Sequence, residues 1–226
     1  MKKVVNRLEE IKRRINFLDF DAHWYRRVFH TFGTSFLVYY MLSSDVEWIR
    51  VLKIWIPLLI ITSLFLLEYM RLKGKIDSNH FFGLRMYEKN RVGSYLFFGV
   101  AILILLWFFP QQIAIPCILC ACLADPIMGE VRYRFGGKNV YIIGFSMCMF
   151  FFVITWYKAG IWIVLLASVV GAVGAVIGET KRFWWLDDDF MIQMVPAVLL
   201  LIIWVSAPHI GFGLPDKIIY PGIVPW

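Results

Sequence analysis

Charged residues are scarce in this sequence. Asp, Glu, Lys and Arg make up 17% of its 226 residues, while apolar residues make up 60%. Soluble domains contain about 25% charged and about 45–50% apolar residues. A chain of this length cannot bury so much apolar surface in one water-soluble core, which excludes a soluble globular enzyme, and intrinsic disorder is excluded as well. The composition predicts an all-α domain, a polytopic transmembrane helix bundle.

Several motifs are also missing. No Walker-type glycine loop is present, which excludes a P-loop kinase. No nucleic-acid-binding motif accompanies the net charge of +7, so a nucleic-acid partner is not expected. The charged stretch at residues 1–14 is not followed by a cleavage site, and no cleavable signal peptide is expected. The few cysteines lie in apolar stretches, where packing is expected rather than a metal site or a disulfide; they are Cys117, Cys120, Cys122 and Cys148.

Seven apolar stretches are long enough to be candidate membrane spans. They cover residues 28–43, 52–70, 93–110, 112–128, 139–157, 159–178 and 190–207. The first is the weakest, because it carries His30, Thr31 and Thr34. The sixth is rich in glycine, which would let a neighbouring helix approach closely.

Lys and Arg concentrate in alternate loops. The N-terminal tail and the loops after the second, fourth and sixth stretches carry most of the 23 Lys and Arg residues. The positive-inside rule therefore predicts a cytoplasmic N-terminus and, with seven spans, an extracytoplasmic C-terminus. We expect an amphipathic cytoplasmic segment at residues 1–25, a transmembrane catalytic bundle at 26–207 and an extracytoplasmic tail at 208–226.

Acidic side chains collect on the predicted cytoplasmic side. Charges inside or at the edge of spans are costly, by about 2.5–3.5 kcal/mol at the helix centre on insertion scales, and are functional candidates. Carboxylates bind Mg²⁺ together with phosphate oxygens, and Arg and Lys neutralise phosphate charge. The pattern therefore predicts a nucleoside triphosphate with Mg²⁺; the alternative is that these charges only anchor helix ends. The acids are Glu68, Asp125, Glu130, Glu179, Asp187, Asp188 and Asp189, and the bases are Arg71, Arg85, Arg132, Arg134 and Lys181.

The segment LADPIMGEVRYRFGGKN contains Asp125. It resembles the signature Gly-Asp-Thr-x-Ala-Ser-x-x-Gly-x-x-Phe-Gly of the membrane-embedded, CTP-dependent lipid kinases, which include dolichol kinase, phytol kinase and the fungal CTP-dependent diacylglycerol kinase. Asp125 falls on the signature Asp, and Phe135 and Gly136 fall on the closing Phe-Gly.

Other motifs agree with this family in order and spacing, over about residues 26–205. RRVFHTFG resembles its basic-x-x-His-x-x-Gly opening, and LDDDFMIQM resembles its last motif. The further matching positions are Arg27, His30 and Gly33 in the opening, Glu68 with Arg71, Arg85 with Glu88, Glu179, and Asp187 with Asp188.

The chain also departs from the signature. Ala124, Pro126, Gly129 and Arg132 replace the family's Gly, Thr, Ser and second Gly, and Asp189 stands where the last motif has Asn. Pro126 lacks both a backbone donor and a hydroxyl that could contact phosphate. We expect rebuilt phosphate contacts or a different substrate, with loss of activity as an alternative.

The resemblance implies transfer of the γ-phosphoryl group of CTP, with Mg²⁺, to the hydroxyl of a polyprenol-like or diacylglycerol-type lipid at the cytoplasmic interface of the bilayer. The residues expected to hold Mg²⁺ are Asp125, Asp188 and Glu179. Those expected to bind the nucleotide phosphates are Arg85, Arg132, Arg134, Lys181, Gly136 and Gly137. Asp125 or Asp187 would accept the hydroxyl proton, and His30 would orient the acceptor unless it only packs. Glu68, Arg71 and Glu88 would support the site.

Three other functions fit parts of the pattern. A cytidylyltransferase making CDP-lipids would use the same ligands, but its Ser-x-x-Lys-Arg signature is absent. A transporter or channel would place charges near the bilayer midplane and often contains repeats, neither of which is found here. A catalytically inactive relative is the third alternative.

Overall fold

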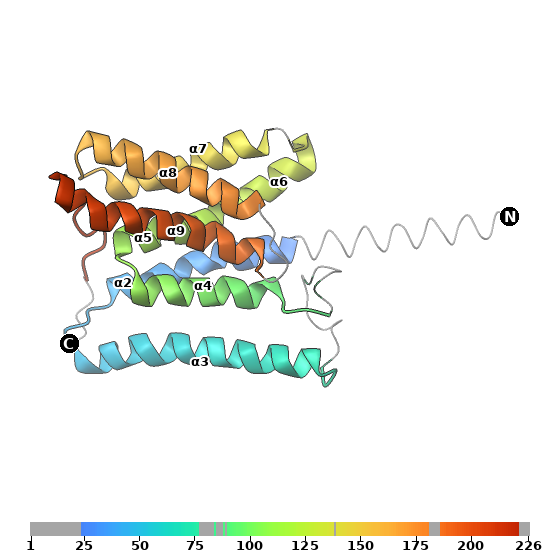
Figure 1. Cartoon of the computed structure of the whole chain (residues 1–226). Coiled ribbons are helices and arrows are strands. Elements are labelled where there is room, and N and C mark those ends of the chain that lie inside the picture. The colour runs from blue at the N-terminus through green and yellow to red at the C-terminus, as the bar shows by residue number, and fades with distance from the viewer. Residues whose placement is uncertain are drawn as a thin grey trace.

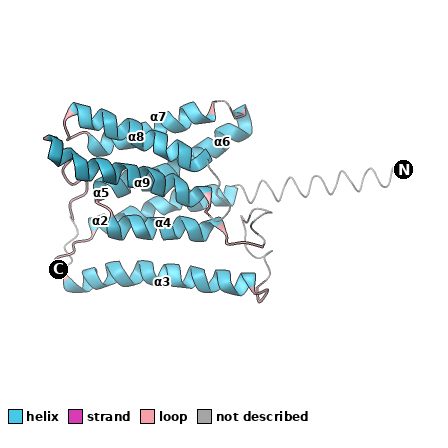
Figure 2. Cartoon of the chain, viewed as in Figure 1, coloured by secondary structure: helices cyan, strands magenta, loops and turns pink. Residues whose placement is uncertain are grey.

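The structure is a computed structural model that describes residues 24–76, 84, 88, 90–137, 139–180 and 186–221. Within these ranges the regular elements are helices joined by loops (Figure 2), which confirms the all-α prediction. The expected amphipathic segment at residues 1–25 lies almost wholly outside the described residues.

The first half of the chain supplies three helical segments. Residues 24–32 form a helix that tightens into the 3₁₀-helix η1 (Gly33–Leu37) and ends in the short α2 (Val38–Met41). This bent segment is the polar first stretch of the sequence prediction. Two straight helices follow it, α3 (Glu47–Leu72) and α4 (Ser94–Phe108).

The fourth segment is one continuous 25-residue rod made of three elements. These are α5 (Gln111–Leu119), the π-helical turn η4 (Cys120–Ala124) and α6 (Asp125–Phe135). The predicted span ended at residue 128, with the following arginines in a loop; that boundary was wrong. The helix continues to Phe135 because no residue before Gly136 breaks it, and Gly136 ends it with a φ of 78°.

The last segments are α7 (Val140–Trp156), α8 (Ile161–Thr180) and α9 (Asp188–Ser206), followed by the 3₁₀-helix η5 (Ala207–Ile210). Four segments are long and apolar enough to cross a membrane, namely α3, the α5–η4–α6 rod, α8 and α9 with η5, whereas α4 and α7 are apolar but shorter. These helices indicate a multi-pass membrane protein. Seven crossings and the orientation stay predictions.

The helices run roughly along a common axis (Figure 1). The α5–η4–α6 rod lies inside the bundle, and most of its apolar side chains are buried. In contrast, α3 lies along one edge next to α4 (Figure 1), and only four of its residues are buried. The core therefore depends on the other helices, and α3 leaves most of its apolar surface for lipid.

Glycine allows α8 and α9 to pack closely. A Cβ atom on Gly178 would lie 2.4 Å from the backbone oxygen of Met191, and one on Gly174 would lie 3.1 Å from Cα of Pro196. No side chain fits at these distances, so the two backbones are in contact. This confirms the close approach that the glycine-rich stretch predicts.

The C-terminal tail folds against the start of α5. The side-chain amide of Gln111 makes two hydrogen bonds to the backbone of Ile219. The Ile219 N–H donates to Gln111 Oε1 over 3.0 Å, and the Ile219 carbonyl accepts from Gln111 Nε2 over 3.2 Å. Gln112 Nε2 donates to the Pro215 carbonyl over 3.0 Å. The tail thus covers the end of the bundle far from Asp125.

Replacing Gly178 with Ala should destabilise the bundle. The added methyl group would meet backbone of α9 rather than a movable side chain, so we expect a loss of about 1–3 kcal/mol. Gly129→Ala is the matched control, since a Cβ there meets nothing within 4 Å. Thermal unfolding in detergent measures both; equal midpoints for the two variants would contradict the close α8–α9 contact.

Candidate functional site

Carboxylates from three helices meet at one end of the bundle, which we call the acidic end. Asp125 begins α6, Glu179 lies in the last turn of α8, and Asp187, Asp188 and Asp189 surround the start of α9. The sequence prediction placed these residues on one side, and the structure brings them together. All except Asp125 are almost fully buried, with exposed fractions of 6% or less.

The start of α9 stabilises its own acidic run. Asp187 is the N-cap in an extended conformation, and its carbonyl accepts from the N–H groups of Phe190 and Met191. Asp188 and Asp189 occupy the first helical turn, where the helix dipole favours negative charge. The local sequence therefore fixes three carboxylates next to one another at a helix N-terminus.

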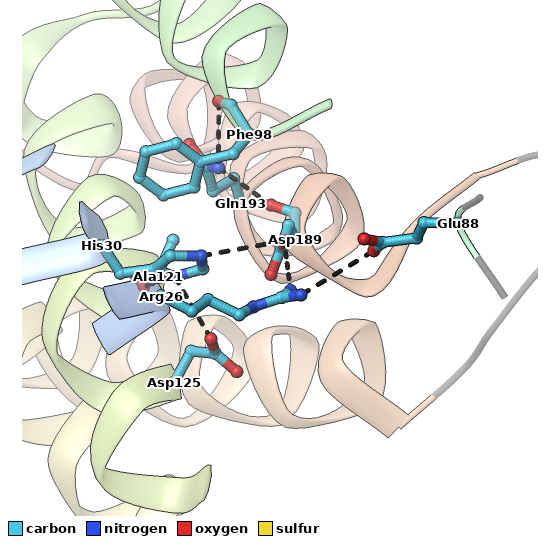
Figure 3. Close-up of polar contacts among 8 residues, drawn as sticks. All are labelled: Arg26, His30, Glu88, Phe98, Ala121, Asp125, Asp189 and Gln193. Carbon is cyan, nitrogen blue, oxygen red and sulfur yellow. Dashed lines mark hydrogen bonds and ion pairs between the residues drawn. The ribbon is translucent and has the colours of Figure 1, made fainter. Parts of the chain in front are cut away.

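Arg26 connects this run to the N-terminal helix. Its Nη2 donates to Asp189 Oδ2 over 2.6 Å, and its Nη1 lies 3.8 Å from Glu88 Oε1. Figure 3 shows the guanidinium lying between these two carboxylates. A hydrogen bond between two charged, largely buried groups is strong, and separating its partners leaves an unpaired buried charge. The Arg26–Asp189 contact therefore fixes residues 24–32 against α9.

His30 lies one turn after Arg26 and faces two acids. Its Nδ1 is 3.3 Å from Asp125 Oδ2 and 3.3 Å from the Ala121 carbonyl, while its Nε2 is 3.8 Å from Asp189 Oδ2 (Figure 3). Both neighbours of Nδ1 are acceptors, so Nδ1 carries a hydrogen. The ring of Phe98 covers the imidazole at 4.7 Å between centroids. The prediction that His30 belongs to the site is therefore consistent with its contacts.

Gln193 supports Asp189 from the next turn of α9. Its Nε2 donates to the Asp189 carbonyl over 2.9 Å and approaches the Phe98 carbonyl at 3.5 Å (Figure 3). Gln193 is fully buried, so its amide joins α9 to α4 behind the acids.

Asp125 follows directly after the π-helical turn η4. Pro126 has no backbone N–H and cannot donate a hydrogen bond to a carbonyl of the preceding turn. That turn is the π-helical η4. A π-turn adds a residue to the helix repeat and is frequent at functional sites. With its side chain 23% exposed, Asp125 is the most accessible carboxylate of the acidic end.

Glu179 is bound on one side only. Arg132 Nη2 donates to Glu179 Oε1 over 2.5 Å, whereas Oε2 is buried and has no hydrogen-bond partner. An unsatisfied buried carboxylate oxygen is costly, so Oε2 is an acceptor that a ligand would satisfy.

The other predicted phosphate-binding residues differ in position. Arg134 pairs with Glu130, which also binds Arg27, and its side chain is 67% exposed. Gly136 and Gly137 lie in the exposed turn after α6, and the positive φ of Gly136 is explained by helix termination. Their contact with phosphate stays a prediction. Arg85 and Lys181 lie outside the described residues.

The predicted supporting residues form a second network at the same end. Arg71 makes two hydrogen bonds to Glu68, of 2.8 and 2.6 Å, and donates to the carbonyls of Glu88 and Arg91. Glu68 also accepts from the Gly93 N–H over 2.6 Å and from the Tyr95 hydroxyl. This network fixes the segment before α4, and the Glu88 side chain extends from it to Arg26.

Two groups of side chains have ligand atoms close enough for a metal ion. They are His30 with Asp125 and Asp189, and Asp187 with Asp188 and Asp189; within each group the ligand atoms lie within 4.8 Å of one another. Adjacent carboxylates repel one another, and oxygen-rich sets suit Mg²⁺. Neither group is the expected set of Asp125, Asp188 and Glu179, whose ligand atoms do not all lie within this distance of one another. The carboxylates of the two groups still fit Mg²⁺, and the buried Oε2 of Glu179 is a further acceptor.

Sequence reasoning missed two members of the site, namely Arg26 and Gln193. Arg26 lies four residues before His30, and that helical spacing places the two on one face. Asp189 was named among the candidate acids and as a departure from the motif, but no role was assigned to it. Gln193 lies four residues after Asp189, in an otherwise apolar helix. The spacing of four residues, which places two side chains on one helix face, would have indicated both Arg26 and Gln193.

Comparison with protein-family models, curated proteins and solved structures gives no match. The resemblance to CTP-dependent lipid kinases therefore stays a hypothesis, supported by the motifs and by the geometry of the acidic end.

Removing Arg71 should destabilise the protein strongly. Arg71→Ala leaves Glu68 buried without its cation, which costs about 3–5 kcal/mol. Arg50→Ala is a matched control, because Glu47 and Arg50 form a pair of the same spacing on the same helix, with side chains 85% and 60% exposed. Thermal unfolding should show little change for that variant. Similar losses for both variants would contradict a structural role of the buried pair.

Mg²⁺ or Mn²⁺ should stabilise the wild-type protein. A cation at about 100 times its Kd adds about 2.7 kcal/mol, or roughly 5–10 °C in the unfolding midpoint. Asp188→Asn should abolish this shift without breaking the Arg26–Asp189 contact, and Asp216→Asn, in the exposed tail, should retain it. The metal-site assignment fails if the wild type shows no shift or if Asp188→Asn keeps it.

Proposed function

We propose that this protein is an integral-membrane lipid kinase. It transfers the γ-phosphoryl group of CTP to the hydroxyl of a lipid alcohol, polyprenol-like or of the diacylglycerol type, at the cytoplasmic interface. The observation that carries the proposal is the convergence of carboxylates from α6, α8 and α9, most of them buried, near His30 and Arg26 at one end of an apolar bundle. The choice of CTP comes from the motif resemblance.

The acidic end supplies what phosphoryl transfer requires. The reaction depends mainly on positioning and on neutralising phosphate charge. Mg²⁺, held by Asp187, Asp188 and Asp189 with Glu179 nearby, would neutralise the phosphate oxygens when bound. The Arg132 side chain, about half-exposed beside Glu179, can contact the phosphate chain without a movement of α6.

Asp125 is the carboxylate best placed to receive a proton. It is more accessible than Asp187, the alternative base of the sequence prediction, and the Nδ1–H of His30 orients it. In the reaction the acceptor hydroxyl oxygen forms a bond to the γ-phosphorus, the bond from that phosphorus to the β–γ bridging oxygen breaks, and CDP leaves. The hydroxyl proton passes to Asp125, which acts as general base.

The membrane location agrees with the two substrates. A nucleotide enters from water, whereas a lipid alcohol stays in the bilayer, so the site must lie where helix ends meet the aqueous phase. Two features support this location: Glu179 lies in the last turn of α8, and Asp187, Asp188 and Asp189 lie at the start of α9, at the same end of the bundle (Figure 1).

A transfer assay tests this function. Purified protein in lipid micelles receives γ-labelled CTP or ATP, Mg²⁺ and a panel of polyprenols, geranylgeraniol and diacylglycerol. We expect label in one class of lipid, with CDP as the second product, and a loss of at least about 100-fold in Asp125→Ala. Asp216→Ala, in the exposed tail, should keep full activity.

The products also distinguish the other candidate functions. Pyrophosphate with a CDP-lipid would instead identify a cytidylyltransferase. Nucleotide binding without any product would identify an inactive relative. No product and no nucleotide binding by folded protein would overturn the nucleotide site itself.

A further inference from the structure

An elongated apolar groove lies between the N-terminal helical segment, α3 and α4. It has a volume of about 250 Å³. The N-terminal segment contributes Phe29, Phe32, Gly33 and Phe36, a set that repeats every three or four residues and forms one helix face.

The groove follows α4 over most of its length. Its α4 lining runs from Tyr95 to Leu106 and includes Gly99, Ile102 and Leu103. Eleven residues of helix correspond to about 16 Å. A site of this shape fits an extended hydrocarbon chain better than a compact polar ligand.

The opposite wall belongs to α3, the helix with the least buried surface. Pro57, Ile60, Ile61 and Leu64 line it, again with helical spacing. At Gly99 a Cβ would lie only 2.9 Å from Ile61 Cδ1, so the glycine allows the Ile61 side chain to pack directly against α4 at this point of the wall. Because Ile60 is also 40% exposed, this wall borders the surface that faces lipid.

One end of the groove lies against the acidic end. Phe98 lines the groove and also covers His30, at 4.7 Å between ring centroids. Phe29 lines it too and directly precedes His30 in the chain, with its ring 6.0 Å from that of Phe98. The groove and the candidate catalytic residues are therefore continuous.

We propose that this groove binds the hydrocarbon chain of the acceptor lipid and directs its hydroxyl toward His30 and Asp125. The inference rests on the proposed function for the identity of the lipid. The physical basis has two parts. The apolar lining along three helices matches a hydrocarbon chain, and polar groups at one end only match a single hydroxyl. Chain burial would contribute the binding free energy, and Phe98 would set the depth of the headgroup.

Photolabelling tests the groove without requiring catalysis. The probe is geranylgeraniol with a diazirine on its terminal isoprene unit, added to the full-length protein in micelles, with labelled peptides mapped by mass spectrometry. Label should fall within residues 57–64 of α3 and 99–106 of α4, and excess unlabelled geranylgeraniol should remove it.

Matched tryptophan variants make the test specific. Ile60→Trp and Leu103→Trp fill the groove, and each should reduce labelling about tenfold, as expected when about two methylene groups of the chain lose their burial. Leu59→Trp and Ile104→Trp change neighbouring residues on the same helices that do not line the groove, and they should label like the wild type. All four variants keep the acidic end intact.

Each outcome separates this inference from the proposed function. Label spread over the lipid-facing surfaces of α8 and α9, label that competitor does not remove, or equal labelling of Ile60→Trp and Leu59→Trp would overturn the groove, even if phosphoryl transfer is observed. Competed label in the groove supports lipid-chain binding, even if no lipid in the transfer assay accepts phosphate.

Discussion

The hydrogen bond between Arg26 and Asp189 holds the candidate site together. It joins the N-terminal helix to α9, and both partners are largely shielded from water. Because His30 lies one turn after Arg26, the same bond places the imidazole between Asp125 and Asp189. It also places Phe29 beside Phe98 of α4, where the apolar groove meets the acids. The polar site and the groove therefore depend on one ion pair, and Gln193 restrains its acidic partner from behind.

A membrane bundle explains why the charges gather at one end. Ionised groups are costly in hydrocarbon, and the carboxylates of α8 and α9 lie where one of these helices ends and the other begins. Asp125 lies near them, at the junction of η4 and α6. Close α8–α9 packing through Gly178 brings Glu179 near the start of α9. Burial then leaves several carboxylates at short range, an arrangement that a divalent cation would stabilise. The Glu68–Arg71 network secures the segment that carries Glu88 to the same end.

Hydrophobic length and charge were sufficient to predict the helices, because long apolar runs have few other structures in a membrane. They also predicted that Asp125, Glu179 and the Asp187–Asp189 run share one side. They could not locate the end of α6, since residues 129–135 are polar yet remain helical up to Gly136. Nor could they find the partnership of Arg26 with Asp189 or the groove along α4, because both depend on how distant helices pack. Motif matching treated Asp189 as a departure from the family pattern, whereas in the structure it contacts both Arg26 and His30.

The central claim is that the acidic end binds a Mg²⁺–nucleotide complex. The most direct measurement is an electron cryomicroscopy structure of the protein in nanodiscs, with Mg²⁺ and a non-hydrolysable CTP analogue in which a methylene group replaces the β–γ bridging oxygen. The account predicts density for the metal beside Asp187, Asp188 and Asp189, with the phosphate chain extending toward Arg132. Well-resolved acidic side chains with no ligand density at saturating analogue, or nucleotide bound at another part of the protein, would contradict it.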